Sequence, residues 1–325
     1  MILVTGGSGL VGEVLIRKLL DQGKQVSALV HSTSLSLSHQ NLREIHCDIL
    51  DMGGLEDALH GIEQVYHCAG VISFYPSQQQ QMFKVNVEGT ANLVNACLAA
   101  KVKKMLHISS IAALERLNEE NMIDESAQWS EDSGGSQYGY SKFLGEMEVW
   151  RGIEEGLNAV IVNPSIILGA GDWDNASTKI FKTVKKGFKW YSDGTTGFVD
   201  VRDLVDAMIK LMNSEVSGKR FIISEGNHSY REIFNMIADG FNVQRPSKKV
   251  STLMSDIIWR MESIRSKFTG SRPLITKETA RAAHARVQFD NSRLLQQFPD
   301  FQYRPMEETI KDVCRMLLET PFGKK

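Results

Sequence analysis

Two tyrosines and a lysine lie within QYGYSKFLGE, residues 137–146, at the start of a segment with helical periodicity. Residues four apart share one face of a helix, so Tyr138 faces Lys142 whereas Tyr140 points elsewhere. An ammonium group favours the ionised form of a nearby phenol and lowers its pKa toward neutrality. The pair could therefore transfer a proton in catalysis, or it could be an ordinary half-exposed pair on a helix surface.

A second group of chemically suggestive residues is a glycine turn near the N-terminus. Gly6, Gly9 and Gly12 follow the apolar run ILVT and open a helical segment. Glycine permits a sharp turn and lets backbone N–H groups approach a pyrophosphate at the positive end of a helix. Between a first strand and a first helix, this turn predicts a dinucleotide site. The alternative is a tight turn that serves packing only.

The residue that ends the second apolar run bears on the choice of cofactor. NAD sites place an acidic side chain there to bind both ribose hydroxyls, whereas this chain has His31. Because His31 could donate to a 2'-phosphate, NADP is favoured over NAD, although His31 could also be a solvated strand end. Asp48 is expected beside the adenine, or as a helix cap. Cys68, Ala69 and Gly70 are expected to line the cofactor after the fourth strand.

Paired serines end the fifth apolar run, KMLHISS. Open α/β sheets bind ligands at the C-terminal ends of their strands. The hydroxyl of Ser109 or Ser110 could therefore donate to a substrate carbonyl opposite Tyr138, or the two serines could simply form a turn.

The elements that must position these residues alternate between strand and helix. Apolar runs such as ILVT, QVSALV, QVYHCAG and NAVIVNPS are separated by segments with helical periodicity. This order predicts an α/β fold with a Rossmann-type, doubly wound parallel sheet. We expect a Rossmann domain at 1–165, to which 198–224 returns. Residues 166–197 and 225–325 are expected to form a smaller, mostly helical substrate lobe.

Composition narrows the classes of partner. The 325 residues carry a net charge of -2 with both signs interspersed, so neither nucleic acid nor a membrane surface is expected, and a small molecule is. The four cysteines have no CxxC spacing and the histidines no ligand spacing, so no metal is predicted. The chain opens on an apolar strand, with no leader and no membrane-spanning run, which predicts a cytoplasmic location.

Together these stretches resemble the extended short-chain dehydrogenases/reductases, the NAD-dependent epimerase/dehydratase family. The resemblance spans essentially the whole chain, through TGGSGLVG, CDILD, VYHCAG, NVEGTANLV, HISS, YGYSKFLGE, NPSIILGAGD and FVDVRD. It implies a catalytic set of Ser110, Tyr138 and Lys142. In that set Tyr138 is the acid/base, and Lys142 lowers its pKa and binds the nicotinamide ribose. Tyr140 would be structural.

The family pattern implies cofactor contacts at the glycine turn and at several strand ends. The expected positions are Gly6, Gly9, Leu10, Val11, Gly12, His31, Asp48, Ile49, Cys68, Ala69, Gly70, Ser109, Tyr138, Lys142 and Pro164. Asn163-Pro164 before a hydrophobic run resembles the dihydroflavonol reductase and cinnamoyl-CoA reductase branch, which usually prefers NADP. Ile111 and Ala112 stand where sugar-nucleotide dehydratases carry an acidic pair, so dehydration is not expected.

Three functions fit this resemblance. The favoured one is NAD(P)-dependent reduction of a small aldehyde or ketone, or the reverse oxidation, with the tyrosine as acid/base. The second is a nucleotide-sugar epimerase with tightly bound NAD. Its diphosphate could be bound by Lys179, Lys182, Arg220 or Arg272, although solvated surface charges are the favoured interpretation of these four residues. The third, a non-catalytic dinucleotide-binding protein, is disfavoured because the tyrosine and the lysine are both present.

Two features concern surfaces. In residues 254–268, apolar residues recur at helical spacing: Ile257, Ile258, Met261, Ile264 and Phe268. That face could cover the substrate, form a subunit contact or touch a membrane, and core packing of the small lobe is the favoured interpretation. By analogy with the family, a homodimer could form through helices at about 78–101 and 137–155.

Overall fold

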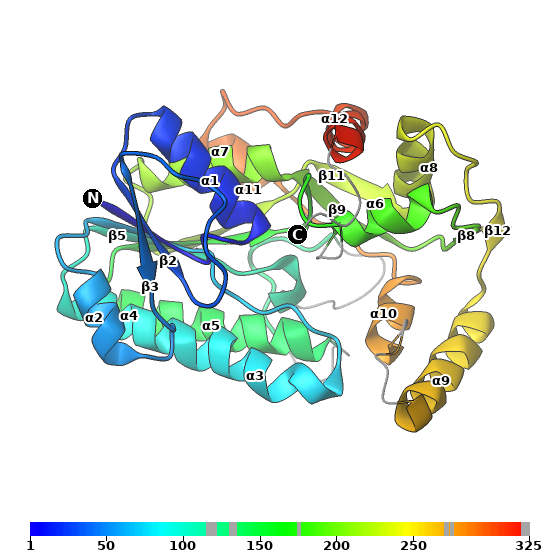
Figure 1. Cartoon of the computed structure of the whole chain (residues 1–325), viewed down its shortest axis with the longest axis horizontal. Helices are drawn as coiled ribbons and strands as arrows, with labels where there is room; N and C mark the ends of the chain where they lie inside the picture. The colour runs from blue at the N-terminus through cyan, green and yellow to red at the C-terminus, as the bar shows by residue number, and fades with distance from the viewer. Residues whose placement is uncertain (115–121, 130–134, 174–176, 270–272, 274–275, 320–325) are drawn as a thin grey trace.

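A parallel sheet of seven strands forms the centre of the molecule, in the order β10-β6-β5-β4-β1-β2-β3 (Figure 1). The computed structural model describes residues 1–114, 122–129, 135–173, 177–269, 273 and 276–319. The strands are β1 (Ile2–Thr5), β2 (Val26–Val30), β3 (Leu42–His46), β4 (Gln64–His67), β5 (Lys104–Ile108), β6 (Ala159–Pro164) and β10 (Lys219–Ile223). The predicted Rossmann-type α/β fold is confirmed.

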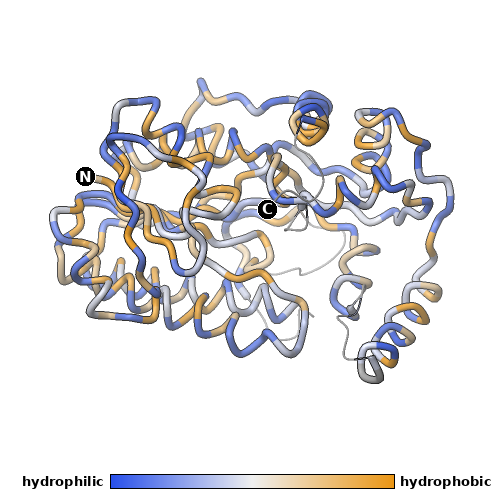
Figure 2. The backbone as a smooth tube through the Cα atoms, viewed as in Figure 1, coloured by the Kyte–Doolittle hydropathy of each residue, from blue (hydrophilic) through white to orange (hydrophobic). Residues whose placement is uncertain are grey.

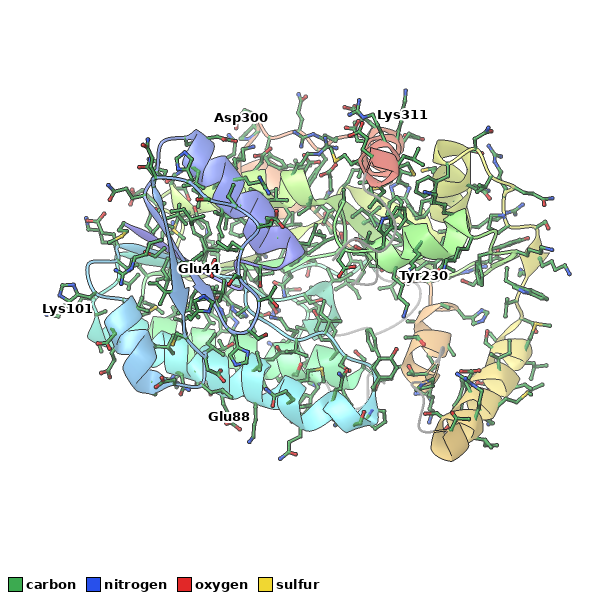
Figure 3. All side chains as sticks on the ribbon, viewed as in Figure 1. Glu44, Glu88, Lys101, Tyr230, Asp300 and Lys311 are labelled. Carbon is green, nitrogen blue, oxygen red and sulfur yellow. The ribbon has the colours of Figure 1, made fainter. Side chains whose placement is uncertain are left out.

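Helices cover both faces of this sheet. One face carries α1 (Leu10–Asp21), α7 (Val201–Met212) and α11 (Ser292–Gln297). The other carries α2 (Met52–Ala58), α3 (Gln79–Phe83), α4 (Gly89–Ala99) and α5 (Gln137–Glu154). The central strands are rich in hydrophobic residues, and charged side chains such as Glu88 and Lys311 project from the outer surface (Figures 2 and 3). This is the pattern of a sheet that is buried on both faces.

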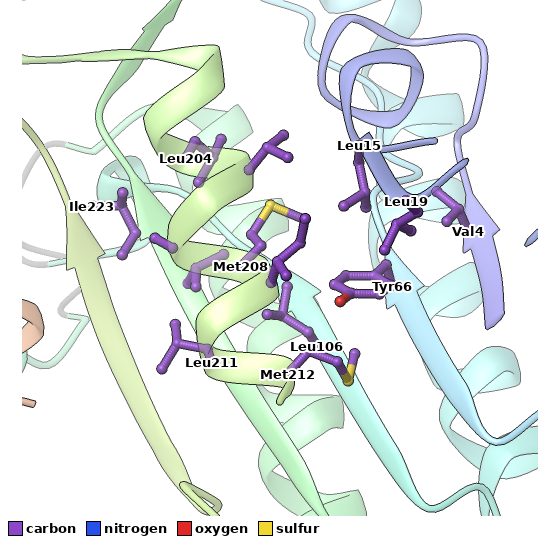
Figure 4. Packing of buried hydrophobic residues seen from close by; sticks show 14 of the residues in the cluster. Val4, Leu15, Leu19, Tyr66, Leu106, Leu204, Met208, Leu211, Met212 and Ile223 are labelled. Carbon is purple, nitrogen blue, oxygen red and sulfur yellow. The ribbon is translucent and has the colours of Figure 1, made fainter. Parts of the chain in front are cut away.

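Alternation along the strands creates two separate cores. Tyr66 and Leu106 point toward α1 and α7, and Figure 4 shows Leu106 beside Met208 and Met212 of α7 and Tyr66 beside Leu19 of α1. Their neighbour Val65 points toward α4 and α5 instead. Because β5, β4 and β1 are parallel neighbours, their C-terminal ends meet at one edge of the sheet, where their last residues can reach a common ligand.

A second, smaller set of elements follows β6. β7 (Ile166–Leu168), β9 (Thr195–Asp200) and β11 (Gly226–Ser229) form a sheet of three strands, and β8 (Trp190–Tyr191) pairs with β12 (Lys248–Lys249). A third core joins α6 (Thr178–Lys185), α8 (Tyr230–Gly240) and α12 (Met306–Glu319). Two further helices, α9 (Thr252–Thr269) and α10 (Lys277–Ala282), extend from this part of the molecule (Figure 1).

The structure contradicts the core-packing interpretation of residues 254–268. Ile257, Met261 and Ile264 are 58%, 64% and 56% exposed on α9. Only Ile258 is partly buried, and the Phe268 side chain lies outside the described part of the molecule. Helical spacing correctly indicated an apolar face, but that face points away from the lobe. Across the described residues, no helix is both long and apolar enough to cross a membrane.

Candidate active site

The glycine turn connects β1 to α1 and lies against the end of β4. Gly6 has a φ of +66°, which favours glycine, and an added Cβ there would meet the Ala69 backbone at 2.7 Å. A side chain on Gly12 would collide with the Gly6 carbonyl oxygen. Gly9 caps α1 without a side-chain hydrogen bond, so side chains leave the N–H groups of Leu10 and Val11 uncovered. The turn therefore fits a pyrophosphate group.

A directed chain of hydrogen bonds anchors the end of β4 behind this turn. The Ala69 N–H donates to Thr5 Oγ1 (3.1 Å), which lies 2.9 Å from His67 Nδ1. His67 Nε2 lies 3.0 Å from Thr90 Oγ1, and that hydroxyl donates to the Asn86 carbonyl. If Thr5 donates to Nδ1, Nε2 carries the proton, and His67 is neutral. Burial supports this state, since it lowers the pKa of His67 to about 3.

Asn86 ties the loop after β4 to the catalytic helix. It lies in a π-helical turn, η2 (Lys84–Glu88), a distortion that is frequent at functional sites. Its Oδ1 accepts from Val71 N (2.8 Å), and its Nδ2 donates to Val71 O and to Ser141 Oγ, both at 2.9 Å. Ser141 in turn donates to the carbonyl of Tyr138. The amide is buried and uses both of its ends, so it holds α5 against this loop.

Tyr138 and Ser110 come together at the C-terminal end of β5. Ser110 caps a short helix, η3 (Ile111–Ala113), by accepting from Ala112 N at 3.1 Å. The phenol of Tyr138 is half-buried, with its ring edge-to-face against Phe74. Burial raises the pKa of Tyr138, and a hydrogen bond with the Ser110 side chain opposes that rise. The expected lowering of this pKa is therefore not seen.

Lys142 lies on the same face of α5 as Tyr138 but bonds to the backbone of β5. Its Nζ is buried and donates to the Ile108 carbonyl at 2.7 Å. Burial lowers the pKa of Lys142 to about 8, and the Glu146 carboxylate opposes that shift. The same Nζ lies 3.7 Å from the position of a Cβ added to Gly70, so the lysine reaches the expected cofactor side of the sheet.

Asn163 positions the backbone of Ser110 from the neighbouring strand. Its Nδ2 donates to the Ser110 carbonyl (3.0 Å) and to Glu146 Oε2 (2.9 Å). Glu146 is buried, and its Oε1 accepts from Arg220 NH1 at 2.9 Å. Arg220 is therefore part of an ion pair that joins α5 to β10, and its side chain is only 14% exposed. Neither of the two interpretations from the sequence, a diphosphate ligand or a solvated surface charge, describes it. Arg272 lies outside the described residues.

The adenosine end of the expected site brings His31 and Asp48 together. His31 Nε2 lies 3.4 Å from Asp48 Oδ2, and both side chains are exposed to a large extent. A carboxylate is thus present where the sequence suggested none. Asp48 also accepts from Leu50 N at 3.0 Å, as in an Asx turn. The N-cap of α2 is Asp51, so the helix-cap alternative for Asp48 is wrong. On the same side, Glu44 accepts from Leu35 N at 2.9 Å, and this lowers the pKa of Glu44 (Figure 3).

The remaining expected cofactor positions lie around this edge of the sheet. Ser109 is buried, and its Oγ has no hydrogen-bond partner within the described residues, which suits a ligand contact. Pro164 ends β6. Burial raises the pKa of Cys68 to about 12, so its thiol is neutral. Ile49 is buried against Gly89, and this packing is its observed contact.

A polar cavity of 670 Å³ opens in the smaller lobe. Its lining residues are Asp193, Thr195, Ser229, Arg231, Glu232, Asn235, Arg286 and Gln288. All are polar, and the buried Oδ1 of Asn235 has no hydrogen-bond partner in the described part of the chain. Lys179 and Lys182 on α6, which the sequence offered as possible diphosphate ligands, are not among these residues. Arg231 and Arg286 were not anticipated, because they come from two segments 55 positions apart.

One strand-like segment lines the cavity and also packs near the residue after Ser110. The Thr195 N–H donates to the Ala285 carbonyl, and the Val287 N–H donates to the Thr195 carbonyl, both at 2.9 Å. Val287 packs against a cluster that includes Ile111, the residue directly after Ser110.

Residues 2–224 match the sequence model of the NAD dependent epimerase/dehydratase family. The chain belongs to this family. The resemblance drawn from the glycine turn and the Tyr-x-x-x-Lys motif is thereby confirmed. The family and its relatives are NAD(P)-dependent oxidoreductases and epimerases, and the chain is assigned to that group of enzymes.

Curated relatives of this family support the reductase-like branch. Sterol demethylase protein B of Methylococcus capsulatus is 27% identical over 299 residues, which cover 90% of each chain. A putative dihydroflavonol 4-reductase of Synechocystis sp. is 27% identical over 305 residues, 90% of this chain and 88% of that one. Cinnamoyl-CoA reductase 1 of Petunia hybrida is 27% identical over 277 residues, 79% and 81% of the two chains.

A solved structure extends the similarity to the whole fold. The crystal structure of gox2253 has a TM-score of 0.86 and 27% identity to this chain. The alignment covers 100% of this chain and 99% of that one. The smaller lobe is thus similar to a solved structure as well, although the family match ends at residue 224.

Proposed function

We propose that the chain is an NAD(P)-dependent reductase of a small aldehyde or ketone, or catalyses the reverse oxidation. The observation that carries this proposal is the approach of the Ser110 and Tyr138 side chains to each other at the end of β5, on the edge where the glycine turn and Lys142 lie. Two hydroxyl groups there can bind one carbonyl oxygen. The relatives named as reductases support the same chemistry.

In the reducing direction, a dinucleotide held at the glycine turn and Lys142 would provide the hydride for the carbonyl carbon. Ser110 and Tyr138 donate hydrogen bonds to the carbonyl oxygen, where negative charge develops. Tyr138 then gives its proton to that oxygen. A phenol whose pKa is raised is protonated at neutral pH, which is the state that donation requires. Lys142 holds the helix to β5 and places its ammonium beside the expected nicotinamide ribose.

NADP is the cofactor that we propose, with His31 as the residue that meets its 2'-phosphate. For this to occur, His31 must turn from Asp48, which lies 3.4 Å away and would repel the phosphate. NAD would instead place its ribose hydroxyls near the Asp48 carboxylate. NADP would thus require His31 to turn away from Asp48, whereas NAD would require the Asp48 carboxylate beside the ribose.

We further propose that residues 166–197 and 225–325 form the substrate lobe, with 1–165 and 198–224 as the cofactor domain. The partner is a small carbonyl compound or alcohol, and no nucleic acid. A homodimer through the helices near 78–101 and 137–155 remains part of the proposal by analogy alone. The cytoplasmic location expected from the sequence is likewise a proposal.

The polar cavity supports one alternative function, a nucleotide-sugar epimerase. Arg231 and Arg286 could bind the two phosphate groups of a nucleoside diphosphate. Asp193 and Glu232 line the same cavity, and their charges offset this attraction. An epimerase oxidises and re-reduces a single carbon, so it would retain its cofactor through the reaction.

Cofactor binding separates these functions. The purified chain is denatured and its supernatant assayed for NAD and NADP, and the protein is titrated with NADPH and NADH by fluorescence. Exchangeable NADPH, followed by turnover in an aldehyde and ketone screen, is the result that a reductase gives. Retained NAD with no net oxidation of added NADH would favour the epimerase. Absence of binding for either cofactor would overturn both functions.

A further inference from the structure

An apolar stripe runs along the outer side of α9. Leu253, Ile257, Met261 and Ile264 are 75%, 58%, 64% and 56% exposed. Large apolar side chains are normally scattered singly over a protein surface, whereas these four recur every three or four residues on one helix. α9 also stands apart from the main body at one end of the molecule (Figure 1).

The opposite side of α9 faces the protein through the partly buried Ser255, Ile258 and Trp259. Ser255 Oγ lies 2.7 Å from His284 Nε2, whereas the Trp259 Nε1 bond to Asp256 Oδ1, at 3.0 Å, stays within the helix. The inner side thus carries two apolar residues, and the four most exposed ones face outward, unlike the usual arrangement of an amphipathic helix in a globular protein. Contacts within the described part of the chain therefore do not account for the stripe.

Charged residues are arranged asymmetrically around the stripe. In a helical projection, Arg260 and Arg265 fall on its two borders, about 55° and about 85° from its centre. Asp256 and Glu262 fall farther back, where they pair with these arginines at 3.6 and 2.8 Å. Cations thus border the apolar surface, and the carboxylates lie behind them.

We propose that α9 docks on a lipid surface that contains anionic lipids. The stripe would enter the boundary between headgroups and acyl chains, while the long arginine side chains reach the lipid phosphates. From the centre of the stripe outward, apolar residues are followed by cations and then by acids. This order matches the acyl chains, the lipid phosphates and the water that the helix would meet in turn. The neutral overall composition conceals this face, because net charge averages over the whole chain.

A second copy of the chain is the main competing occupant. An 18-residue helix is about 27 Å long, and one pair of such helices buries less than the roughly 1,200–2,000 Å² of a stable interface. Pairing through the stripe would also bring arginines from both copies to the same borders. A lipid surface requires no large protein interface and brings no second set of arginines to these borders. The proposal is independent of the reaction that the chain catalyses.

Vesicle flotation of the full chain tests the proposal. The probes are vesicles of phosphatidylcholine alone and vesicles with one third phosphatidylglycerol. The wild type should float with the anionic vesicles. A triple variant, Ile257→Ser, Met261→Ser and Ile264→Ser, should show a partition coefficient at least about tenfold lower. For the double variant Arg260→Gln, Arg265→Gln, the partition coefficient should fall several-fold on anionic vesicles and change little on neutral ones.

The matched control is Leu318→Ser, which removes an apolar side chain of the same exposure, 56%, from α12. It should bind vesicles as the wild type does. Circular dichroism and a thermal melt establish that each variant is folded. Lack of wild-type binding to either vesicle, or unchanged binding by the folded triple variant, would overturn the proposal. A wild-type dimer that the triple variant converts to monomer in sedimentation, without vesicle binding, would assign the stripe to a second copy.

Discussion

Two regions of the molecule depart in opposite ways from the rule that polar side chains are exposed and apolar side chains are buried. Around the N-terminus of α5, polar side chains are buried: His67, Asn86 and Lys142 are at most 5% exposed. On α9, Ile257 and Met261 are more than half exposed. Buried polar groups and clustered exposed apolar groups are the informative exceptions in a folded protein.

The two exceptions differ in where their partners lie. Asn86 and the Nδ1 and Nε2 atoms of His67 have partners within the chain, at 2.8 to 3.0 Å. Most of that region can be explained without any other molecule. The exceptions within the described residues are the Ser109 hydroxyl, both ring nitrogens of His107 and Asn163 Oδ1, which are buried and have no hydrogen-bond partner. The apolar stripe of α9 lacks such an internal explanation. An internal network indicates a preorganised site, and an outward apolar face indicates contact with another body.

The largest expected effect comes from removing one hydroxyl at the α5 site. Tyr138→Phe should reduce kcat by about 10²–10⁴-fold, because the proton donor and one hydrogen bond to the carbonyl oxygen are both lost. The dissociation constant for NADPH should change little. Steady-state kinetics with the substrate from the carbonyl screen, together with fluorescence titration, measures both quantities.

Tyr140→Phe is the matched control. Tyr140 is two residues away and stacks on Trp129 and Phe143, so its ring is expected to be structural. The variant should keep near-normal kcat. Comparable losses in the two variants would show that packing of the helix, and not the Tyr138 hydroxyl, limits the rate.

Removal of Asn86 from its buried hydrogen-bond network should lower the stability of the fold. Asn86→Ala leaves Val71 and Ser141 without their amide partner in a buried place, and we expect a loss of about 2–4 kcal/mol in the free energy of unfolding. Urea denaturation followed by circular dichroism measures this loss. Asn92→Ala is the control, since Asn92 makes two bonds of 3.4 Å and is only partly buried. Equal losses would mean that the network adds nothing beyond ordinary side-chain contacts.

The neutral state of His67 gives a prediction with a definite sign. Burial lowers the pKa of His67 from 6.5 to about 3, so between these values the unfolded chain binds more protons than the folded one. The free energy of unfolding must then fall as pH falls below 6.5, by up to about 1.4 kcal/mol per pH unit. His67→Gln removes this titration, so its urea midpoint should fall less steeply between pH 6.5 and 4.5. Parallel curves would contradict a buried, neutral His67.

Residues close together in the sequence account for most of what could be predicted. The glycine turn, the serines after β5 and the Tyr-x-x-x-Lys pair each depend on spacing within one strand or helix. The pairing of Arg220 with Glu146, 74 positions earlier, depends on how β10 and α5 pack, and the sequence alone suggested a ligand role. Periodicity likewise showed that α9 has an apolar face, but it could not show what covers that face.

The smallest expected effect is on α9, and it is the sharpest test of the difference between the regions. Ile257→Ser should change the free energy of unfolding by less than about 0.5 kcal/mol, because this side chain is already in water in the isolated protein. Ile233→Ser, in the fully buried core of the same lobe, should cost about 3 kcal/mol or more. Urea denaturation compares the two. A large loss for Ile257→Ser would mean that α9 packs inward in solution, and the stripe would then need no external partner.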